Sequence, residues 1–178
     1  RKELDKALEK TGESFTVEIT RDTDLVRISD NAFGMDLKIL ERAMEFTPPP
    51  IPKGQKTHGR SRYGVGMKTA SGWAGRYMTI RTIMLGTGKE ITIELDWEKI
   101  NSGDEDLDEQ VRDVKKTEHG TVIELTGLYD AAKGRTVTSM RDYMRSIYRM
   151  DIRDNDMVLM WDGDPLKPIS FGDDSFQL

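Results

Sequence analysis

Two pairs of β-rich segments are separated by turns of only four residues, and this spacing constrains the fold more than any other feature. Residues 14–20 and 25–29 flank Arg-Asp-Thr-Asp, and residues 77–85 and 90–97 flank Gly-Thr-Gly-Lys. Turns this short join antiparallel strands, because a parallel pair needs a crossover of a dozen or more residues. The sequence therefore disfavours a doubly wound parallel sheet.

Helical and further β segments complete the order along the chain. Apolar residues recur at helical intervals in residues 1–10, 36–46 and 137–150, and residues 67–73 can also form a helix. A β-branched run at 121–126 and a hairpin about Asp162-Gly163, with arms 157–161 and 166–169, predict further strands. We expect an α+β fold, a two-layer α/β sandwich, with residues 101–109 as a solvated loop or short helix.

Composition excludes several classes of protein. The 178 residues contain no cysteine and two histidines, so a metal would have to be bound through oxygen. No apolar stretch approaches the roughly 20 residues that cross a bilayer, and the first ten residues lack the apolar stretch of a secretory signal. We expect one cytoplasmic domain. The net charge of −5 argues against a nucleic-acid-binding surface over the whole domain.

A long polar loop at residues 47–63 leads into a glycine-rich motif. Pro48 to Pro50 end the helix before it, since proline lacks a backbone donor. Gly64 and Gly66 precede a potential helix whose first turn carries Lys68. The start of a helix offers free backbone donors to a phosphate, and glycines leave room for it. The loop adds four cations that suit the same ligand: Lys53, Lys56, Arg60 and Arg62.

The segment DNAFGMD lies where a strand gives way to a helix. There Asp30 can accept a hydrogen bond from the exocyclic amine of adenine, and Gly34 permits a close backbone approach. The same residue types also serve in ordinary turns and helix caps. Taken alone, this segment therefore leaves both interpretations open.

The order of these segments resembles the GHKL family of ATP-binding domains, in the style of the MORC, MutL and heat-shock chaperone branches. DNAFGMD resembles the family's adenine-binding motif, GRSRYGVGMKTAS its second glycine box, and His119-Gly120-Thr121 its Gly-Thr element. The resemblance implies the Bergerat ATP-binding fold, with a mixed, mainly antiparallel sheet, and ATP and Mg²⁺ as cofactors. It implies a core at residues 1–128, with 129–178 completing the domain and leading to a following one.

Carried over to this sequence, the resemblance assigns each motif a part of the nucleotide. Asp30 would accept from the adenine amine, directly and through a water, with Thr121 completing the polar contact. The base pocket would be lined by Ala32, Gly34 and Met35. The family usually has glycine at the position of Ala32. The phosphates would be bound by one run of residues: Gly64, Val65, Gly66, Met67 and Lys68.

The first helix departs from the family pattern. The family carries a Glu that orients the attacking water and an Asn that holds magnesium, about one turn apart. Here Asp5-Lys6-Ala7-Leu8 aligns with Asp-Asn-Ala-Leu, and a lysine cannot coordinate magnesium. Either the chain is a pseudo-ATPase or the motif helix lies upstream of residue 1; the catalytic residues are therefore not identified.

Three functions follow from these observations. The leading one is an ATP-binding module that hydrolyses ATP in the intact protein, where nucleotide orders the lid and controls homodimerisation or a neighbouring domain. The second is an interaction module without bound nucleotide. The third is the catalytic half of a sensor kinase, which would require a dimerising helix pair with a phosphoacceptor histidine. This function is disfavoured because His58 lies in the loop and His119 lies beside Gly-Thr. No membrane partner is expected, and nucleic acid is left open.

Overall fold

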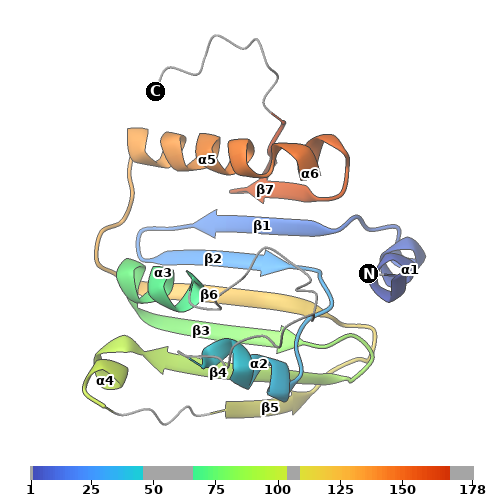
Figure 1. The fold of residues 1–178 in the computed structure, drawn as a ribbon, viewed down its shortest axis with the longest axis horizontal. Coiled ribbons are helices and arrows are strands. Elements are labelled where there is room, and N and C mark those ends of the chain that lie inside the picture. Colours follow the sequence, from blue (N-terminus) through green and yellow to red (C-terminus); the bar gives the residue numbers. More distant parts are fainter. Residues whose placement is uncertain (1, 46–65, 104–108, 169–178) are drawn as a thin grey trace, which may run out of the picture.

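The computed structural model describes residues 2–45, 66–103 and 109–168, which form one sheet with helices packed on it (Figure 1). The helices are α1 (Lys2–Thr11), α2 (Leu37–Met44), α3 (Gly66–Ala74), α4 (Trp97–Asn101), α5 (Arg135–Ile147) and α6 (Arg149–Arg153). The strands are β1 (Thr16–Arg21), β2 (Leu25–Asp30), β3 (Gly75–Ile83), β4 (Lys89–Asp96), β5 (Glu109–Asp113), β6 (Gly120–Leu128), β7 (Val158–Trp161) and β8 (Asp164–Pro165).

The sheet has the order β5-β4-β3-β6-β2-β1-β7-β8. Both expected hairpins form, β1 with β2 and β3 with β4, and every neighbouring pair is antiparallel except β1 and β7. The single parallel pair is possible because α5 and α6 carry the chain between β6 and β7. The mixed, mainly antiparallel sheet that we expected is confirmed.

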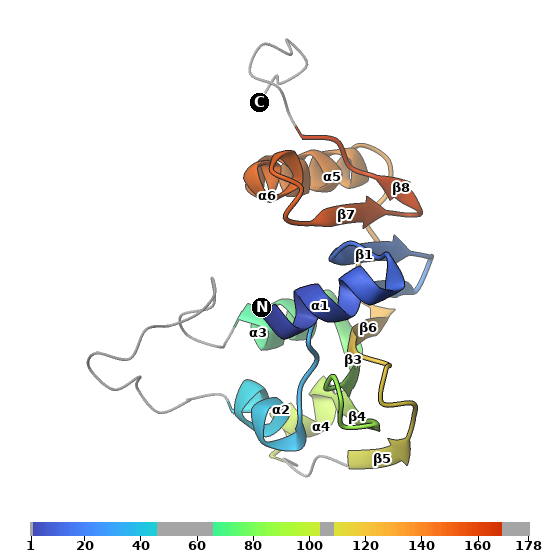
Figure 2. The same ribbon diagram turned by 90° about the vertical axis from the view of Figure 1, so that its right-hand side faces the viewer.

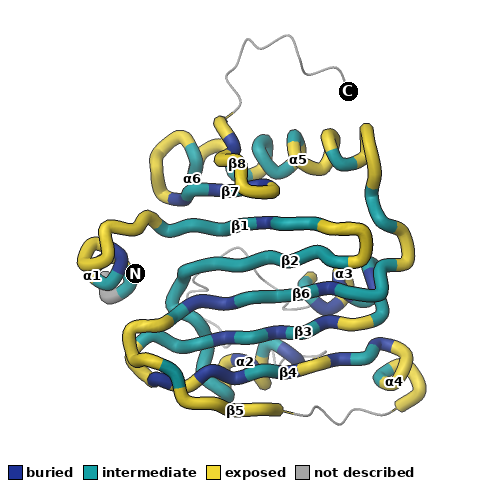
Figure 3. Tube along the Cα trace, turned by 180° about the vertical axis from the view of Figure 1, so that it is seen from behind, coloured by how far each residue is buried: buried dark blue, intermediate teal, exposed yellow. Residues whose placement is uncertain are grey.

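One face of the sheet is apolar and carries helices α2, α3, α5 and α6 (Figure 2). Seen from the other side, in Figure 3, the strands lie in front of α2 and α3. Strand alternation explains this arrangement, because Met78 and Ile80 point to the helices while Arg81 lies on the opposite face with Glu124. The outer face therefore carries charged pairs such as Arg81 with Glu124, and the core lies under the helices.

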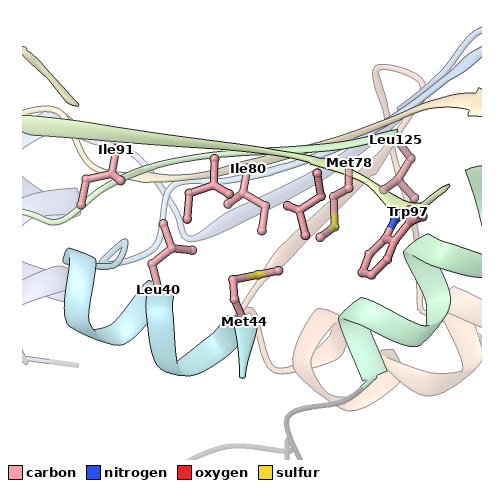
Figure 4. Close-up of a cluster of buried hydrophobic side chains, with 9 residues drawn as sticks. Leu40, Met44, Met78, Ile80, Ile91, Trp97 and Leu125 are labelled. Atoms are coloured by element: carbon pink, nitrogen blue, oxygen red, sulfur yellow. The ribbon is translucent and has the colours of Figure 1, made fainter. Parts of the chain in front are cut away.

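The core consists of two clusters. In the first, Leu40 and Met44 of α2 point at Ile80 and Ile91 of the sheet, with Trp97 beside them (Figure 4). In the second, residues of β1 and β7 pack with Met144 and other side chains of α5. Full burial of such a side chain contributes about 1.5–3 kcal/mol, so each cluster anchors its helices on the sheet.

Several details differ from the sequence-based expectation. An additional edge strand, β5, follows the acidic segment, and the expected helix at 137–150 is divided into α5 and α6. The second arm of the last hairpin follows the turn at once, as β8. The loop at 47–63 lies outside the described residues. Among the helices that the structure describes, none is long and apolar enough to cross a membrane.

Candidate functional site

A row of polar side chains crosses three neighbouring strands on the apolar face of the sheet. Asp30, the last residue of β2, pairs with Thr121 of β6, and Thr121 pairs with Thr82 of β3. Two residues earlier on β2 and β3, Ile28 and Ile80 occupy the same face. Polar groups on such a face need partners, because burying an unsatisfied polar group costs free energy.

Thr82 ties this row to the loop after β2. Its side chain is fully buried, and its hydroxyl accepts a hydrogen bond from the backbone N–H of Met35 at 2.9 Å. The hydroxyls of Thr82 and Thr121 lie 3.1 Å apart and share a hydrogen bond. Sequence reasoning missed Thr82. The available signal was a polar residue continuing the inward alternation of Met78 and Ile80.

The carboxyl group of Asp30 lies in a poorly solvated place. Burial raises the pKa of Asp30, while hydrogen bonds from the backbones of Ala32 and Thr121 and the nearby His119 act in the opposite direction without cancelling the effect. The Ala32 N–H donates to Asp30 Oδ1 at 2.9 Å. A desolvated carboxylate of this kind gains from a further donor, which is the property that an adenine amine would use.

The loop that follows Asp30 is held at several points. The side chain of Asn31 accepts from the Thr16 N–H at 2.7 Å and donates to the Ser14 carbonyl at 3.0 Å. The Leu85 N–H donates to the Phe33 carbonyl at 2.9 Å. The loop is thus attached to the start of β1 and to the end of β3, and Asp30 is presented from a fixed backbone.

Two glycines allow the strands and this loop to approach closely. Gly34 has φ +71°, and a Cβ there would lie 1.8 Å from the Ile83 carbonyl oxygen. Gly120 has φ +120°, and its Cβ would lie 2.2 Å from the Asp30 carbonyl oxygen. We expected Gly34 to permit a close approach to a ligand. The close approach that the structure contains is to the backbone of β3.

The other predicted contacts to the base and the phosphates have different environments. Met35 and Met67 are partly buried and pack against the first core cluster. Gly66 begins α3, whereas Gly64, Val65 and the four cations of the preceding loop lie outside the described residues. Only Gly66, Met67 and Lys68 of the predicted phosphate-binding run can therefore be placed.

Lys68 is engaged with the end of another helix. Its side chain is 1% exposed, and its Nζ donates to the carbonyl oxygens of Ala43 at 2.7 Å and of Glu45 at 2.6 Å. These carbonyls belong to the C-terminal end of α2, where a cation is favoured by the helix dipole. Burial lowers the pKa of Lys68, with Glu45 opposing the effect.

Two grooves lie along strands β1 and β2. They have volumes of about 610 and 750 Å³ and share Ile19, Ile28 and Met144. The first is also lined by Val17, which pairs directly with Asp30 across β1 and β2. Their volumes fall within the roughly 300–1,000 Å³ of small-molecule pockets, but the residues of the polar row do not line either groove.

The described residues offer few ligands for a magnesium ion. Within residues 2–45, 66–103 and 109–168, no group of three acidic or histidine side chains could hold a metal ion. On α1, Asp5 and Lys6 are both exposed, and the lysine has no lone pair to offer magnesium while charged.

Comparison with known sequences assigns the chain to a family. Residues 10–121 match the model of the histidine kinase-, DNA gyrase B- and HSP90-like ATPases. The match covers more than half of the chain, which therefore belongs to this family of ATPase domains. The sequence matches none of the curated proteins with which it was compared.

Solved structures share the fold at low sequence identity. The ATPase region of Saccharomyces cerevisiae topoisomerase II, bound to ICRF-187 (dexrazoxane), aligns with a TM-score of 0.62 at 12% identity over 92% of this chain and 46% of that one. The ATPase and transducer domains of Balamuthia mandrillaris topoisomerase II align with a TM-score of 0.62 at 14% identity, over 93% of this chain and 46% of that one. The Aquifex aeolicus MutL ATPase domain complexed with ADP aligns with a TM-score of 0.50 at 15% identity, over 95% of this chain and 62% of that one. This chain spans about half the length of the topoisomerase structures.

Proposed function

We propose that this chain is an ATP-binding module in which Asp30 and Thr121 recognise the adenine base. The observation that carries the proposal is the polar row on the inner face of the sheet, which ends in the desolvated carboxyl group of Asp30. Family membership supports the same nucleotide, since the matching family consists of ATPase domains.

The contacts suit adenine chemically. The exocyclic amine of adenine is a donor, and an ionised carboxylate accepts only, so Asp30 would pair with the amine. The Thr121 hydroxyl can donate or accept, which allows it to contact a ring nitrogen or an ordered water.

We further propose that residues 1–128 form the nucleotide-binding core and that 129–178 complete the domain and lead to a following one. In the intact protein, which would hydrolyse ATP with Mg²⁺, bound nucleotide would order the lid and so control a homodimer or the neighbouring domain. The phosphates would be held by backbone N–H groups of the run Gly64 to Lys68, which leads into α3. The motifs resemble those of MORC and MutL proteins in style, and we propose this role for a cytoplasmic protein.

A second function is an interaction module that does not use nucleotide. The bond between Ala32 N–H and Asp30 Oδ1 is one that a simple turn residue would also make. The exposed Lys6, in place of the family's metal ligand, favours a chain that does not hydrolyse ATP. Binding of nucleotide separates the two functions.

Calorimetric titration with a non-hydrolysable ATP analogue and magnesium tests the proposal. Asp30→Asn is the decisive variant, because the Asn oxygen can keep the turn bond to Ala32 while the amide nitrogen cannot accept from adenine. Hydrogen bonds to charged groups contribute about 1.5–3 kcal/mol, so affinity should fall by about 10-fold to 100-fold. Asp113→Asn, an exposed carboxyl on β5, is the control. No binding by any form would support the interaction module, whereas equal binding by the Asp30 variant would refute the role of Asp30 in recognising the base.

A further inference from the structure

His119 precedes β6 and contacts the loop that follows β2. Its ring Nδ1 lies 2.8 Å from the carbonyl oxygen of Ala32, although the two residues are 87 positions apart in the sequence. A carbonyl oxygen only accepts, so Nδ1 must carry the hydrogen and donate it. The contact therefore fixes which ring nitrogen is protonated and which side of the ring faces the loop.

The backbone beside His119 leaves little freedom for this contact to shift. Gly120 has φ +120°, and the space where its Cβ would lie is occupied by the carbonyl oxygen of Asp30 at 2.2 Å. Strand β6 thus starts directly against the end of β2. The histidine ring is placed over the loop by that close approach and by its bond to Ala32.

Ala32 is held from both of its polar groups. Its N–H donates to Asp30 Oδ1 at 2.9 Å, and its carbonyl accepts from His119. A movement of Ala32 would remove the hydrogen bond that orients the Asp30 carboxyl group. His119 is therefore connected to Asp30 through Ala32, in addition to its direct electrostatic effect on the carboxyl group.

We propose that His119 is a positioning residue for base recognition, which orients the Asp30 carboxyl group through its hydrogen bond to the Ala32 carbonyl. The proposal rests on the ATP-binding function proposed above. Other residues attach the loop from the sides of β1 and β3, namely Asn31 and Thr82. Within the described residues, His119 contributes the side-chain bond from the start of β6.

Two substitutions separate the hydrogen bond from the volume of the ring. His119→Leu replaces the ring with an apolar side chain of similar size that has no hydrogen-bond donor. His119→Asn places an amide donor close to where Nδ1 lies. Titration with the non-hydrolysable ATP analogue, at a temperature where all forms are folded, should give about tenfold weaker binding for His119→Leu and binding within about threefold of the unsubstituted chain for His119→Asn.

Amide hydrogen exchange without nucleotide tests the contact itself. The His119→Leu chain should exchange faster in the peptide that contains Ala32 and Phe33, and His119→Asn should restore slow exchange. Equal affinity of all three forms, or an equal loss in both variants, would overturn the positioning role. If the unsubstituted chain binds no nucleotide, the ATP-binding proposal and this role both fall. Weaker binding by His119→Leu but not by His119→Asn, together with weaker binding by Asp30→Asn, supports both.

Discussion

Gly34→Ala should destabilise the chain far more than Gly12→Ala, although both glycines have nearly the same backbone conformation. Gly34 has φ +71° and Gly12 has φ +73°, so an alanine pays a similar left-handed strain of about 1–2 kcal/mol at either position. At Gly12 the new Cβ meets nothing within 4 Å, whereas at Gly34 it would lie 1.8 Å from the Ile83 carbonyl oxygen. The difference between the variants therefore isolates the close approach of the loop to β3.

The magnitude follows from what must move. Real Cβ contacts are almost never shorter than 3.0 Å, so the loop must retreat by about 1 Å or more. That movement strains the bonds from Leu85 N–H to Phe33 and from Met35 N–H to Thr82. Two lost hydrogen bonds at about 1 kcal/mol each, with about 1 kcal/mol or more of overpacking, make Gly34→Ala less stable than Gly12→Ala by about 3 kcal/mol.

Thermal unfolding of the two variants measures this difference directly. For a domain of this size, 1 kcal/mol corresponds to about 2–4 °C, so Gly34→Ala should unfold about 6–12 °C below Gly12→Ala. Nucleotide affinity should fall in Gly34→Ala alone, because the same loop presents Asp30. Equal midpoints for the two variants would refute the reasoning, since they would mean that the loop tolerates a side chain against β3.

Asp30→Asn should be more stable than the unsubstituted chain at pH 7 although it should bind nucleotide more weakly. The folded pKa of Asp30 lies above its ordinary 3.8, so ionisation costs the fold free energy as pH rises through the folded pKa, by about 1.4 kcal/mol for each unit of difference. Urea midpoints at pH 7 and pH 4 should converge as pH falls, and a less stable variant at pH 7 would contradict the burial argument. Lys68→Met should lower the free energy of unfolding by about 1–3 kcal/mol, because the carbonyls of Ala43 and Glu45 lose their donor. An unchanged midpoint in thermal unfolding would show that this contact is not maintained in solution.

The parts of the fold that depend on local signals could be predicted from the sequence. The four-residue turns gave both hairpins, and the helical spacing after Asp36 gave α2, whose N-cap is Asp36 itself through its bond to the Ile39 N–H. The edge strand β5 was not predicted, because all five of its residues are exposed and no alternation marks them. Pairing with β4, a tertiary interaction, decides its conformation.

The site shows the same division. The motifs located Asp30, Gly34 and Thr121, and the sheet register brings the first and the last of these together. Sequence motifs could not give Thr82 or His119 a role, because their contacts join segments that are distant along the chain. Lys68 illustrates the limit most clearly: its place in a glycine motif predicts a phosphate contact, and its partners here are carbonyls at the end of α2.

A crystal structure with a bound non-hydrolysable ATP analogue would test the central claim most directly. We predict that the adenine amine lies about 3 Å from the Asp30 carboxylate, with the Thr121 hydroxyl beside the base. Nucleotide bound elsewhere, such as along the groove lined by Ile19 and Met144 with Asp30 not in contact, would contradict the account. So would crystals that remain free of nucleotide at saturating concentrations of the analogue.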